Sequence, residues 1–415
     1  MFALLYLLGD NGLTGLVASR FPFRHFTYPT DRTPNSSRPS NPNFPLDNGF
    51  YVVVSETSGD VYASVLGYPL FMRLGVLDVG SNSAQLQIVE ATAGAPPLPL
   101  HALKVATGLG ESVDASQCLD AGGIERVCRA VTQSLQSAHR YEVDQIYVFV
   151  TAAIRDAANR EEILDQIASE AGLRPQFLTG LQEARLTYFA VHRWYGWCAG
   201  RLLDLDIGGT TMEITLGRDA APELAVSLPL GAGRLTRTFF DADPPSHKQV
   251  KELRRYVRAS LRETADRLLW EGKPQRVVGT SKTFKQLARL TGAPPQRKGP
   301  FVRRTLSRKD LRGWMPRLAA MTTERRSHLQ GIARSRAHQI VAGAIVAYET
   351  LSALDIDEVD VSPWALREGI ILQHLSAVSD PRNELPLHAL SAKPRLDGAS
   401  ITVLPSFDAP LDSTR

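Results

Sequence analysis

The stretch DLDIGGTTMEI, residues 204–214, decides how the rest of the sequence is interpreted. Its apolar first half is typical of a strand that ends at Asp206, and a turn of glycine and threonine follows. Glycine lets an anion approach the backbone closely and threonine adds a hydroxyl donor, so the turn suits a phosphate group. If the turn closes a hairpin, Glu213 lies near Asp206, and the two carboxylates suit a hydrated Mg²⁺ or Mn²⁺. The plainer alternative is that Asp206 only caps the turn.

A second stretch, DVGSNSAQLQI at residues 78–88, repeats the pattern of DIGGTTMEITL at residues 206–216. Each copy follows an apolar strand and opens a new segment, which favours a duplicated domain with two turns that clamp a phosphate chain. A third turn, in VVGTSKTF at residues 277–284, leads into a helix whose N-terminus adds partial positive charge. Taken singly, each turn is also compatible with an ordinary connection. The sequence has neither GxxxxGKS nor GxxxxGKT, so a P-loop nucleotide hydrolase is disfavoured.

Strand and helix patterns alternate along most of the chain, which is typical of an α/β fold with mainly buried sheets. The expected strands cover residues 73–79, 84–90, 144–151, 201–207, 212–217, 223–230, 275–279 and 358–362. The expected helices cover residues 121–139, 156–171, 181–195 and 246–270, with one opening at Ser281, several up to Leu354 and a last one from about Trp364.

Composition excludes several classes of protein. The net charge of +4 over 415 residues gives no strong case for a nucleic-acid or membrane partner. The apolar MFALLYLL at the start is too short to span a bilayer. The 3 cysteines lack CxxC spacing and the 9 histidines form no cluster, which argues against a disulfide framework and a structural zinc site. We therefore expect a cytoplasmic protein.

Composition also suggests where domains begin and end. Residues 1–71 contain no lysine and include a stretch rich in Pro, Ser and Asn, so we expect either a poorly ordered extension or a start wrongly assigned upstream of Met72. Two domains then cover residues 72–196 and 197–380, and the last helix, about 364–379, packs back on the first domain. Residues 381–415 are expected to form a loose tail.

Two further motifs carry charged residues at the ends of regular elements. TAAIRD places Arg155 just past a buried strand, a position suited to binding phosphate, although a surface ion pair is the alternative. GLQEAR places Glu183 in the first turn of a helix, where an acidic residue by itself is usually a match to the helix dipole.

Together these motifs resemble one family. GVLDVGSNS, TAAIRDAANREEIL, GLQEARLTYFAV, DLDIGGTTMEI, GTSKTFKQLARL and SPWALREGIIL occur in the order typical of the exopolyphosphatase and guanosine pentaphosphate phosphohydrolase (Ppx/GppA) family. The resemblance covers residues 73–378 and is greatest to short, two-domain actinobacterial members.

The resemblance implies an actin/Hsp70/sugar-kinase fold, with two ribonuclease H-like domains around a cleft. It places the general base at Glu183, the phosphate-binding arginine at Arg155, and the residues that handle Mg²⁺ or Mn²⁺ at Asp206 and Glu213. The phosphate-binding loops correspond to Gly80, Ser81, Asn82 and Ser83, to Gly208, Gly209 and Thr211, and to Gly279, Thr280 and Ser281.

Several positions depart from the family pattern, and Thr211 keeps the hydroxyl of the family's serine while Met212 is a change that close relatives tolerate. Thr210 stands where the family has glycine, which would be unfavourable if that position requires a positive φ. Gly108 stands where an arginine often precedes Leu-Gly-Glu. Both changes bear on turnover and on the preferred chain length more than on the fold.

The leading functional hypothesis is a metal-dependent exopolyphosphatase, a hydrolase that releases orthophosphate from the end of inorganic polyphosphate, with a preference for short chains. One alternative is a phosphohydrolase that converts pppGpp to ppGpp, a reaction of the stringent response. Others are a polyphosphate- or nucleotide-binding sensor with impaired catalysis, and a kinase or ATPase, although Glu183 favours hydrolysis over transfer. The resemblance is compatible with a homodimer.

Overall fold

The computed structural model describes residues 72–391, apart from 93, 94, 110, 111, 115 and 380–384, together with the backbone of residues 378 and 379 and of strands between residues 4 and 69. The chain divides into two units, residues 1–71 and 72–415. The first unit holds two antiparallel sheets, built from β1 (Leu4–Gly9) and β2 (Gly12–Val17), and from β3 (Asn43–Pro45), β4 (Tyr51–Thr57), β5 (Asp60–Val65) and β6 (Tyr68–Pro69). We expected residues 1–71 to be either a poorly ordered extension or a start wrongly assigned upstream of Met72, and both expectations stay predictions.

The first sheet of the second unit has the strand order β11-β10-β7-β8-β9. Its strands are β7 (Met72–Val79), β8 (Ser83–Ala91), β9 (Pro99–Ala106), β10 (Gln145–Val150) and β11 (Gln176–Phe177). β7, β8 and β9 follow one another in the chain and pair antiparallel, whereas β10 lies parallel to β7, and β11 parallel to β10.

The second sheet has the order β14-β13-β12-β15-β17-β16. Its strands are β12 (Leu202–Ile207), β13 (Met212–Gly217), β14 (Leu224–Leu228), β15 (Arg276–Gly279), β16 (Thr305–Ser307) and β17 (Glu358–Val361). Again three consecutive strands pair antiparallel and two more join in parallel, with β16 added antiparallel at the edge. The shared order confirms the predicted α/β fold of duplicated, ribonuclease H-like domains.

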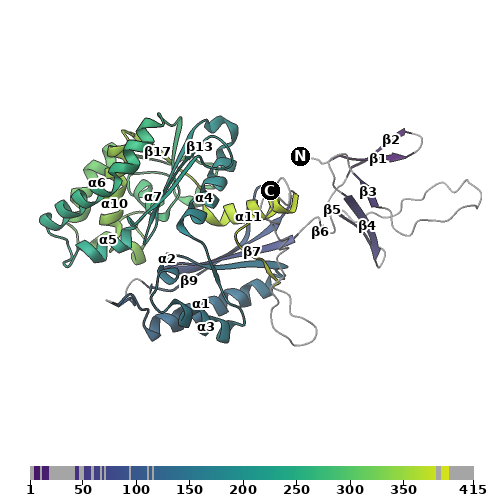
Figure 1. Ribbon diagram of the computed structural model, residues 1–415, viewed down its shortest axis with the longest axis horizontal. Coiled ribbons are helices and arrows are strands. Elements are labelled where there is room, and N and C mark those ends of the chain that lie inside the picture. The colour runs from purple at the N-terminus through teal and green to yellow at the C-terminus, as the bar shows by residue number, and fades with distance from the viewer. Residues whose placement is uncertain are drawn as a thin grey trace, which may run out of the picture. The chain divides into compact units, whose positions relative to one another are not determined.

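Helices cover the sheets because each sheet has an apolar face to bury. Beside the first sheet lie α1 (Ala121–Arg140), α2 (Ala152–Arg155) and α3 (Arg160–Ala171). Beside the second lie α5 (Ala232–Phe239), α6 (His247–Trp270), α7 (Lys282–Leu290), α8 (Arg308–Ala319), α9 (Thr323–Ser327) and α10 (Ile340–Ala353). Short 3-10 helices cover Gly196–Ala199, Gln296–Lys298 and Arg334–Arg336. α6 and α10 lie on the outer side of the second sheet, and α1 and α3 on the outer side of the first (Figure 1).

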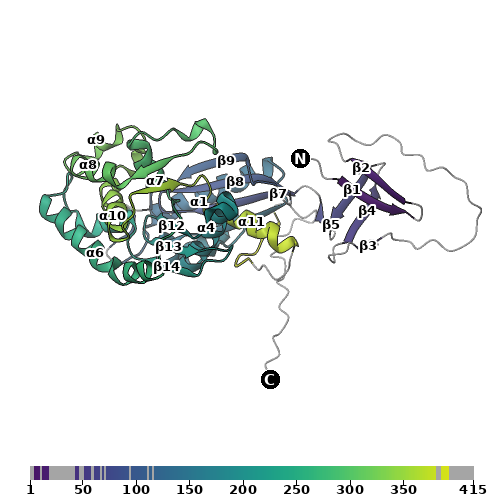
Figure 2. The same ribbon diagram turned by 90° about the horizontal axis from the view of Figure 1, so that it is seen from above.

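Two helices connect the halves of the second unit. α4 (Gly180–Tyr195) packs against β13 and β14, and α11 (Leu366–Ser379) packs against α4 and against β7 of the first sheet. Both views show α4 and α11 side by side (Figure 1 and Figure 2). Ile370 and Ile371 of α11 are fully buried with Leu74 and Val76 of β7, so the last helix completes the core of the first domain.

Some boundaries differ from those expected from the sequence. The helix expected at 156–171 begins at Arg160, because residues 152–155 form the separate turn α2. The tail expected to be loose from residue 381 contains β18 (Leu390–Ser391), which pairs antiparallel with β10 because Leu387 and Leu390 bury their side chains in the core. Residues 392–415 lie outside the described part. No described helix is both long and apolar enough to cross a bilayer.

Candidate functional site

The second unit contains a cleft of about 210 Å³ that both sheets line. The turn between β7 and β8 and the turn between β12 and β13 enter it, and both close in the same way. The Gly80 N–H donates to the carbonyl of Ser83 at 3.2 Å, and the Gly208 N–H donates to the carbonyl of Thr211 at 2.9 Å. The sequence echo therefore corresponds to two equivalent turns that meet at one cavity.

Most of the residues assigned to phosphate binding line this cleft: Gly80, Ser81, Asn82, Ser83, Gly208, Gly209, Thr211, Thr280 and Ser281. Gly279 does not line it. A Cβ at Gly279 would lie 2.5 Å from the ring of Phe284, so this glycine makes room for a core aromatic residue at the end of β15. The assignment of Gly279 to phosphate binding stays a prediction, whereas Ser281 caps α7 by accepting from the N–H of Phe284.

The two turns touch each other, and α5 holds the second one in place. A Cβ at Gly209 would lie 2.8 Å from Oγ of Ser81, which explains the need for glycine at this position. The N–H groups of Ala232 and Arg234 at the start of α5 donate to the carbonyls of Gly208 and Gly209 at 3.0 and 2.9 Å. The start of α5 therefore fixes the backbone of the turn, whose Thr210 and Thr211 also line the cleft.

Thr210 carries no backbone strain. Among the described residues other than glycine, a positive φ occurs at Gln117, Glu142 and Asp355, and Thr210 is not one of them. The penalty considered for threonine in place of glycine therefore does not arise. Gly108, by contrast, has φ of +57°, so the arginine typical of the family would be strained in this backbone.

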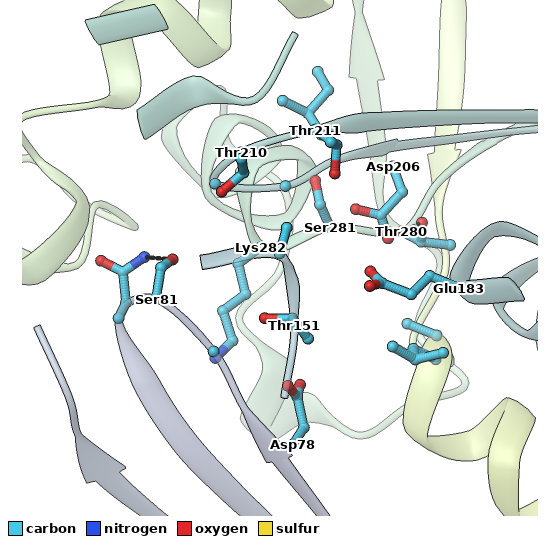
Figure 3. A pocket seen from close by; sticks show the side chains of 18 of the residues that line it. Asp78, Ser81, Thr151, Glu183, Asp206, Thr210, Thr211, Thr280, Ser281 and Lys282 are labelled. Carbon is cyan, nitrogen blue, oxygen red and sulfur yellow. Dashed lines mark hydrogen bonds between the residues drawn. The ribbon is translucent and has the colours of Figure 1, made fainter. Parts of the chain in front are cut away.

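Glu183 lies at the start of α4, with its side chain at the cleft (Figure 3). Thr179 and Gln182 form a capping box that begins the helix and so sets the direction of Glu183. Burial raises the pKa of Glu183 well above its ordinary value, and the nearby carboxylate of Glu213 raises it further. The Arg155 guanidinium opposes both effects on this pKa, with Nη1 2.8 Å from Oε1 of Glu183.

Arg155 does not line the cleft, contrary to what its expected role would require. Its Nη1 also donates to the carbonyl of Leu178 at 2.8 Å, and its Nε donates to Asp156 at 2.8 Å. The remaining Nη2 donates to Asp156 at 3.2 Å. Each guanidinium nitrogen thus has a protein acceptor, and in this structure Arg155 orients Glu183 from behind.

Asp206 and Glu213 lie directly opposite each other in the β12–β13 ladder, as expected for a hairpin. Thr280 donates to Oδ2 of Asp206 at 2.9 Å, and Ser227 donates to Oε1 of Glu213 at 2.8 Å, so one oxygen of each carboxylate is held by a hydroxyl. Burial and then the charge of Asp206 raise the pKa of Glu213 to about 7, and burial raises the pKa of Asp206.

This carboxylate pair fits a divalent cation. The described residues contain no group of three or more His, Cys, Asp or Glu side chains arranged for a metal. Mg²⁺, however, is commonly held by only one or two carboxylates together with water and substrate phosphates. Two carboxylates whose charges repel each other, beside turns suited to phosphate, match that mode of binding.

Asp78 is a site residue that the sequence analysis missed. It occupies in β7 the place that Asp206 occupies in β12, lines the cleft, and leaves its buried Oδ1 without a hydrogen-bond partner among the described residues. Burial raises its pKa, while Arg367, Lys282 and Arg336 lower it. The echo between residues 78–88 and 206–216 was the signal that could have identified it.

The sequence analysis also missed a set of cations at the cleft: Lys282, Lys285, Arg336 and Arg367. Burial and then the charge of Arg336 lower the pKa of Lys282 to about 7. Burial also lowers the pKa of Arg336, against the attraction of Asp206 and Asp78. Lys282 follows the third turn directly and Arg367 lies within SPWALREGIIL, so both could have been found from those motifs, whereas Arg336 comes from a segment with no local motif. The cleft therefore offers a polyanion both cations and a carboxylate pair.

Comparison with known proteins identifies the family to which this chain is similar. Residues 87–378 match the sequence model of the Ppx/GppA phosphatase family. The exopolyphosphatase 1 of Mycobacterium tuberculosis is 45% identical over 309 residues, which is 74% of this chain and 90% of that protein. An uncharacterized protein of Streptomyces coelicolor is 42% identical over 306 residues, 73% of this chain and 90% of that protein.

Two solved structures are similar as well. The Ppx/GppA enzyme of Aquifex aeolicus has a TM-score of 0.61 at 28% identity, covering 75% of this chain and 100% of that one. An exopolyphosphatase of Cytophaga hutchinsonii has a TM-score of 0.68 at 23% identity, covering 74% of this chain and 98% of that one, and supports the fold alone.

Proposed function

Because the chain belongs to the Ppx/GppA phosphatase family, we propose that it is an exopolyphosphatase, which hydrolyses the terminal phosphoanhydride bond of inorganic polyphosphate and releases orthophosphate. One observation carries the proposal. The carboxylate of Glu183, with its raised pKa, lies at the same cleft as the two turns suited to phosphate. A basic carboxylate beside a phosphate site is what hydrolysis by water requires.

In this mechanism Glu183 orients a water molecule against the terminal phosphorus and takes one of its protons. The new bond joins the water oxygen to phosphorus, and the bond from phosphorus to the bridging oxygen breaks. The bridging oxygen leaves with the shortened chain as its new terminal oxygen. Because a base accepts a proton more readily when its pKa is higher, burial of Glu183 favours this step once the carboxyl group is ionised.

The cleft binds the substrate through donors from both turns. Backbone N–H groups of the turns and the hydroxyls of Ser81 and Thr211 donate to phosphate oxygens. Lys282 and Arg336 contribute positive charge near the same space. Arg155 contributes indirectly, because it holds Glu183 in one orientation.

For a metal, we propose Mg²⁺ or Mn²⁺ held by Asp206 and Glu213. These two carboxylates would hold the cation where it would neutralise charge on the phosphoryl oxygens. We expect chelation of divalent cations to abolish phosphate release and added Mg²⁺ or Mn²⁺ to restore it. Asp206→Asn should raise the metal concentration that gives half-maximal activity, and an unchanged requirement would contradict this assignment.

The structure weakens the hypothesis of a sensor with impaired catalysis. That hypothesis was motivated by Thr210, which proves to be free of left-handed strain. Glu183 is also oriented toward the cleft by its capping box and by Arg155.

The experiment is to measure phosphate release from tripolyphosphate, with pppGpp assayed in parallel. Glu183→Gln keeps the shape of the side chain but removes the base, so kcat should fall by about 10²–10⁴-fold. The control is Glu252→Gln, which changes an exposed glutamate on α6. Equal phosphate release by the wild type and by Glu183→Gln would refute the mechanism, and release from pppGpp alone would refute the substrate.

A further inference from the structure

A second, smaller cavity of about 60 Å³ lies next to the cleft. Four residues of the two turns line both cavities: Ser81, Asn82, Gly209 and Thr210. Ser81 and Thr210 lie on one side of the cleft and Glu183 and Asp206 on the other (Figure 3). The small cavity is therefore separated from the catalytic carboxylates by the turns themselves.

The small cavity is rich in hydrogen-bond donors. Arg234 and Arg237 line it from α5, three positions apart and so on one face of that helix. Neither guanidinium forms an ion pair with any acidic side chain of the described part of the chain. Burial, and then repulsion by Arg234, lowers the pKa of Arg237 below its ordinary value. Two neighbouring cations without a counter-charge favour a bound anion.

A buried amide gives independent support. Gln339 lines the small cavity, is only 4% exposed, and has an Nε2 without a hydrogen-bond partner in the described part of the chain. An unpartnered buried donor is costly unless a ligand or water accepts from it. Its position is fixed, because the buried Arg326 donates to the carbonyls of the two preceding residues, Ala337 and His338, at 3.0 and 3.3 Å.

Among the described residues that line this cavity, one carries a carboxylate, and both of its oxygens already accept hydrogen bonds. Asp156 lines the cavity, but its two oxygens accept from Nε and Nη2 of Arg155 at 2.8 and 3.2 Å. The amide of Asn82 lies at the cavity as well and adds a neutral donor. The lining therefore carries a net positive charge and several donors.

From this arrangement we propose that the small cavity is a second phosphate-binding site, which takes one tetrahedral phosphate group between Arg234, Arg237, Gln339 and Asn82. The ligand chemistry is the same for free orthophosphate and for one unit of a polyphosphate chain. Occupancy of this site is separate from hydrolysis, because the two turns stand between it and Glu183. The inference concerns binding of phosphate and does not require that the cleft hydrolyse polyphosphate.

Equilibrium dialysis of the full chain with radiolabelled orthophosphate tests the proposal. The wild type should bind two phosphates, and Arg234→Gln/Arg237→Gln should bind one, with affinity at the lost site weakened by at least about tenfold because charge-assisted hydrogen bonds are removed. Arg255→Gln, an exposed arginine on α6, is the control and should bind two. An unchanged stoichiometry in the double variant would overturn the proposal.

A second measurement covers the case in which the double variant does not fold. Crystals of the wild type soaked in tungstate, a heavier tetrahedral oxyanion, should show anomalous density between Arg234 and Arg237. Density at the cleft with none at the small cavity would count against the site.

The source of the phosphate group can be distinguished with Glu183→Gln, which should bind polyphosphate without hydrolysing it. If the site takes free orthophosphate, one labelled orthophosphate stays bound when tripolyphosphate saturates the cleft. If it takes a unit of the same chain, tripolyphosphate displaces the label from both sites. Both results support the site, whereas a label bound at neither site before tripolyphosphate is added would refute it.

Discussion

Replacing Arg155 by glutamine distinguishes two roles for this arginine, because the family resemblance assigns it to the phosphate and the structure places it behind Glu183. Its Nη1 lies 2.8 Å from Oε1 of Glu183, and the side chains are only 13% and 14% exposed. An opposite charge this close lowers the pKa of a carboxyl group by about one to three units. The Coulomb attraction between two unit charges about 4 Å apart, in a medium of dielectric constant about 20, is at most about 4 kcal/mol. Converted to pKa, this energy agrees with the range above.

The sign of the effect follows from the role of the carboxylate. Glu183 must be deprotonated to accept a proton, so activity is lost as the pH falls through its pKa. Removing Arg155 removes the interaction that lowers this pKa, and the pKa therefore rises further. The acid limb of kcat/KM should move to higher pH in Arg155→Gln, while kcat/KM at high pH stays within a few fold of wild type.

The assay is phosphate release from tripolyphosphate between about pH 5 and about pH 9, with kcat and KM separated at each pH. Arg129→Gln is the control, because Arg129 forms an exposed pair with Glu125 at 2.6 Å on α1, away from the cleft. Arg155→Lys should recover part of the shift, since it restores the charge but not the second hydrogen bond. An acid limb that stays in place while KM rises at every pH would show that Arg155 binds the substrate, and the positioning role would then be wrong.

Other variants probe the turns and the cations. Lys282, with a pKa of about 7, loses its charge as the pH rises through that value, so kcat/KM should fall above about pH 7. Lys282→Arg should remove this alkaline limb, because arginine stays charged, and an alkaline limb that persists in the variant would count against Lys282. Thr210→Gly should bring no gain in turnover, because threonine already fits the backbone there. It should lower the free energy of unfolding by about 0.5–1 kcal/mol in denaturant titrations. A marked gain in turnover would show that the turn is compromised. Gly209→Ala should raise KM, since its Cβ would meet Oγ of Ser81 at 2.8 Å. The control, Gly313→Ala, has no atom within 4 Å of the added Cβ and should leave KM unchanged. Equal KM values in the two variants would contradict the close contact.

The duplicated turns were predictable because the signal is local. An apolar run, an Asp-x-Gly turn and a second β-prone run predict a hairpin at each place, and the hairpin then brings Asp206 opposite Glu213 by register alone. The capped helix of Glu183 was predictable for the same reason. These features depend on residues close together in the chain.

Features set by long-range contacts were not predictable in this way. The direction of the Arg155 guanidinium depends on Leu178 and Glu183, more than 20 residues away. Gly279 looked like part of a phosphate-binding turn, but the ring of Phe284 occupies the space beside it. Arg336 reaches the cleft from a segment that carries no motif for anion binding.

The two copies of the turn are not equal, and the difference bears on how a substrate would lie in the cleft. Asp206 faces Glu213 across the second hairpin, whereas Asp78 faces the uncharged Gln85 across the first. Arg367 donates to Oε1 of Gln85 at 3.3 Å, so the first turn is accompanied by a cation where the second is accompanied by a second carboxylate. On the proposed function, the end of the polyphosphate lies at the second turn, where the acidic pair suits a metal. The rest of the chain, which carries uncompensated negative charge, then lies toward the first turn, where Arg367 attracts it.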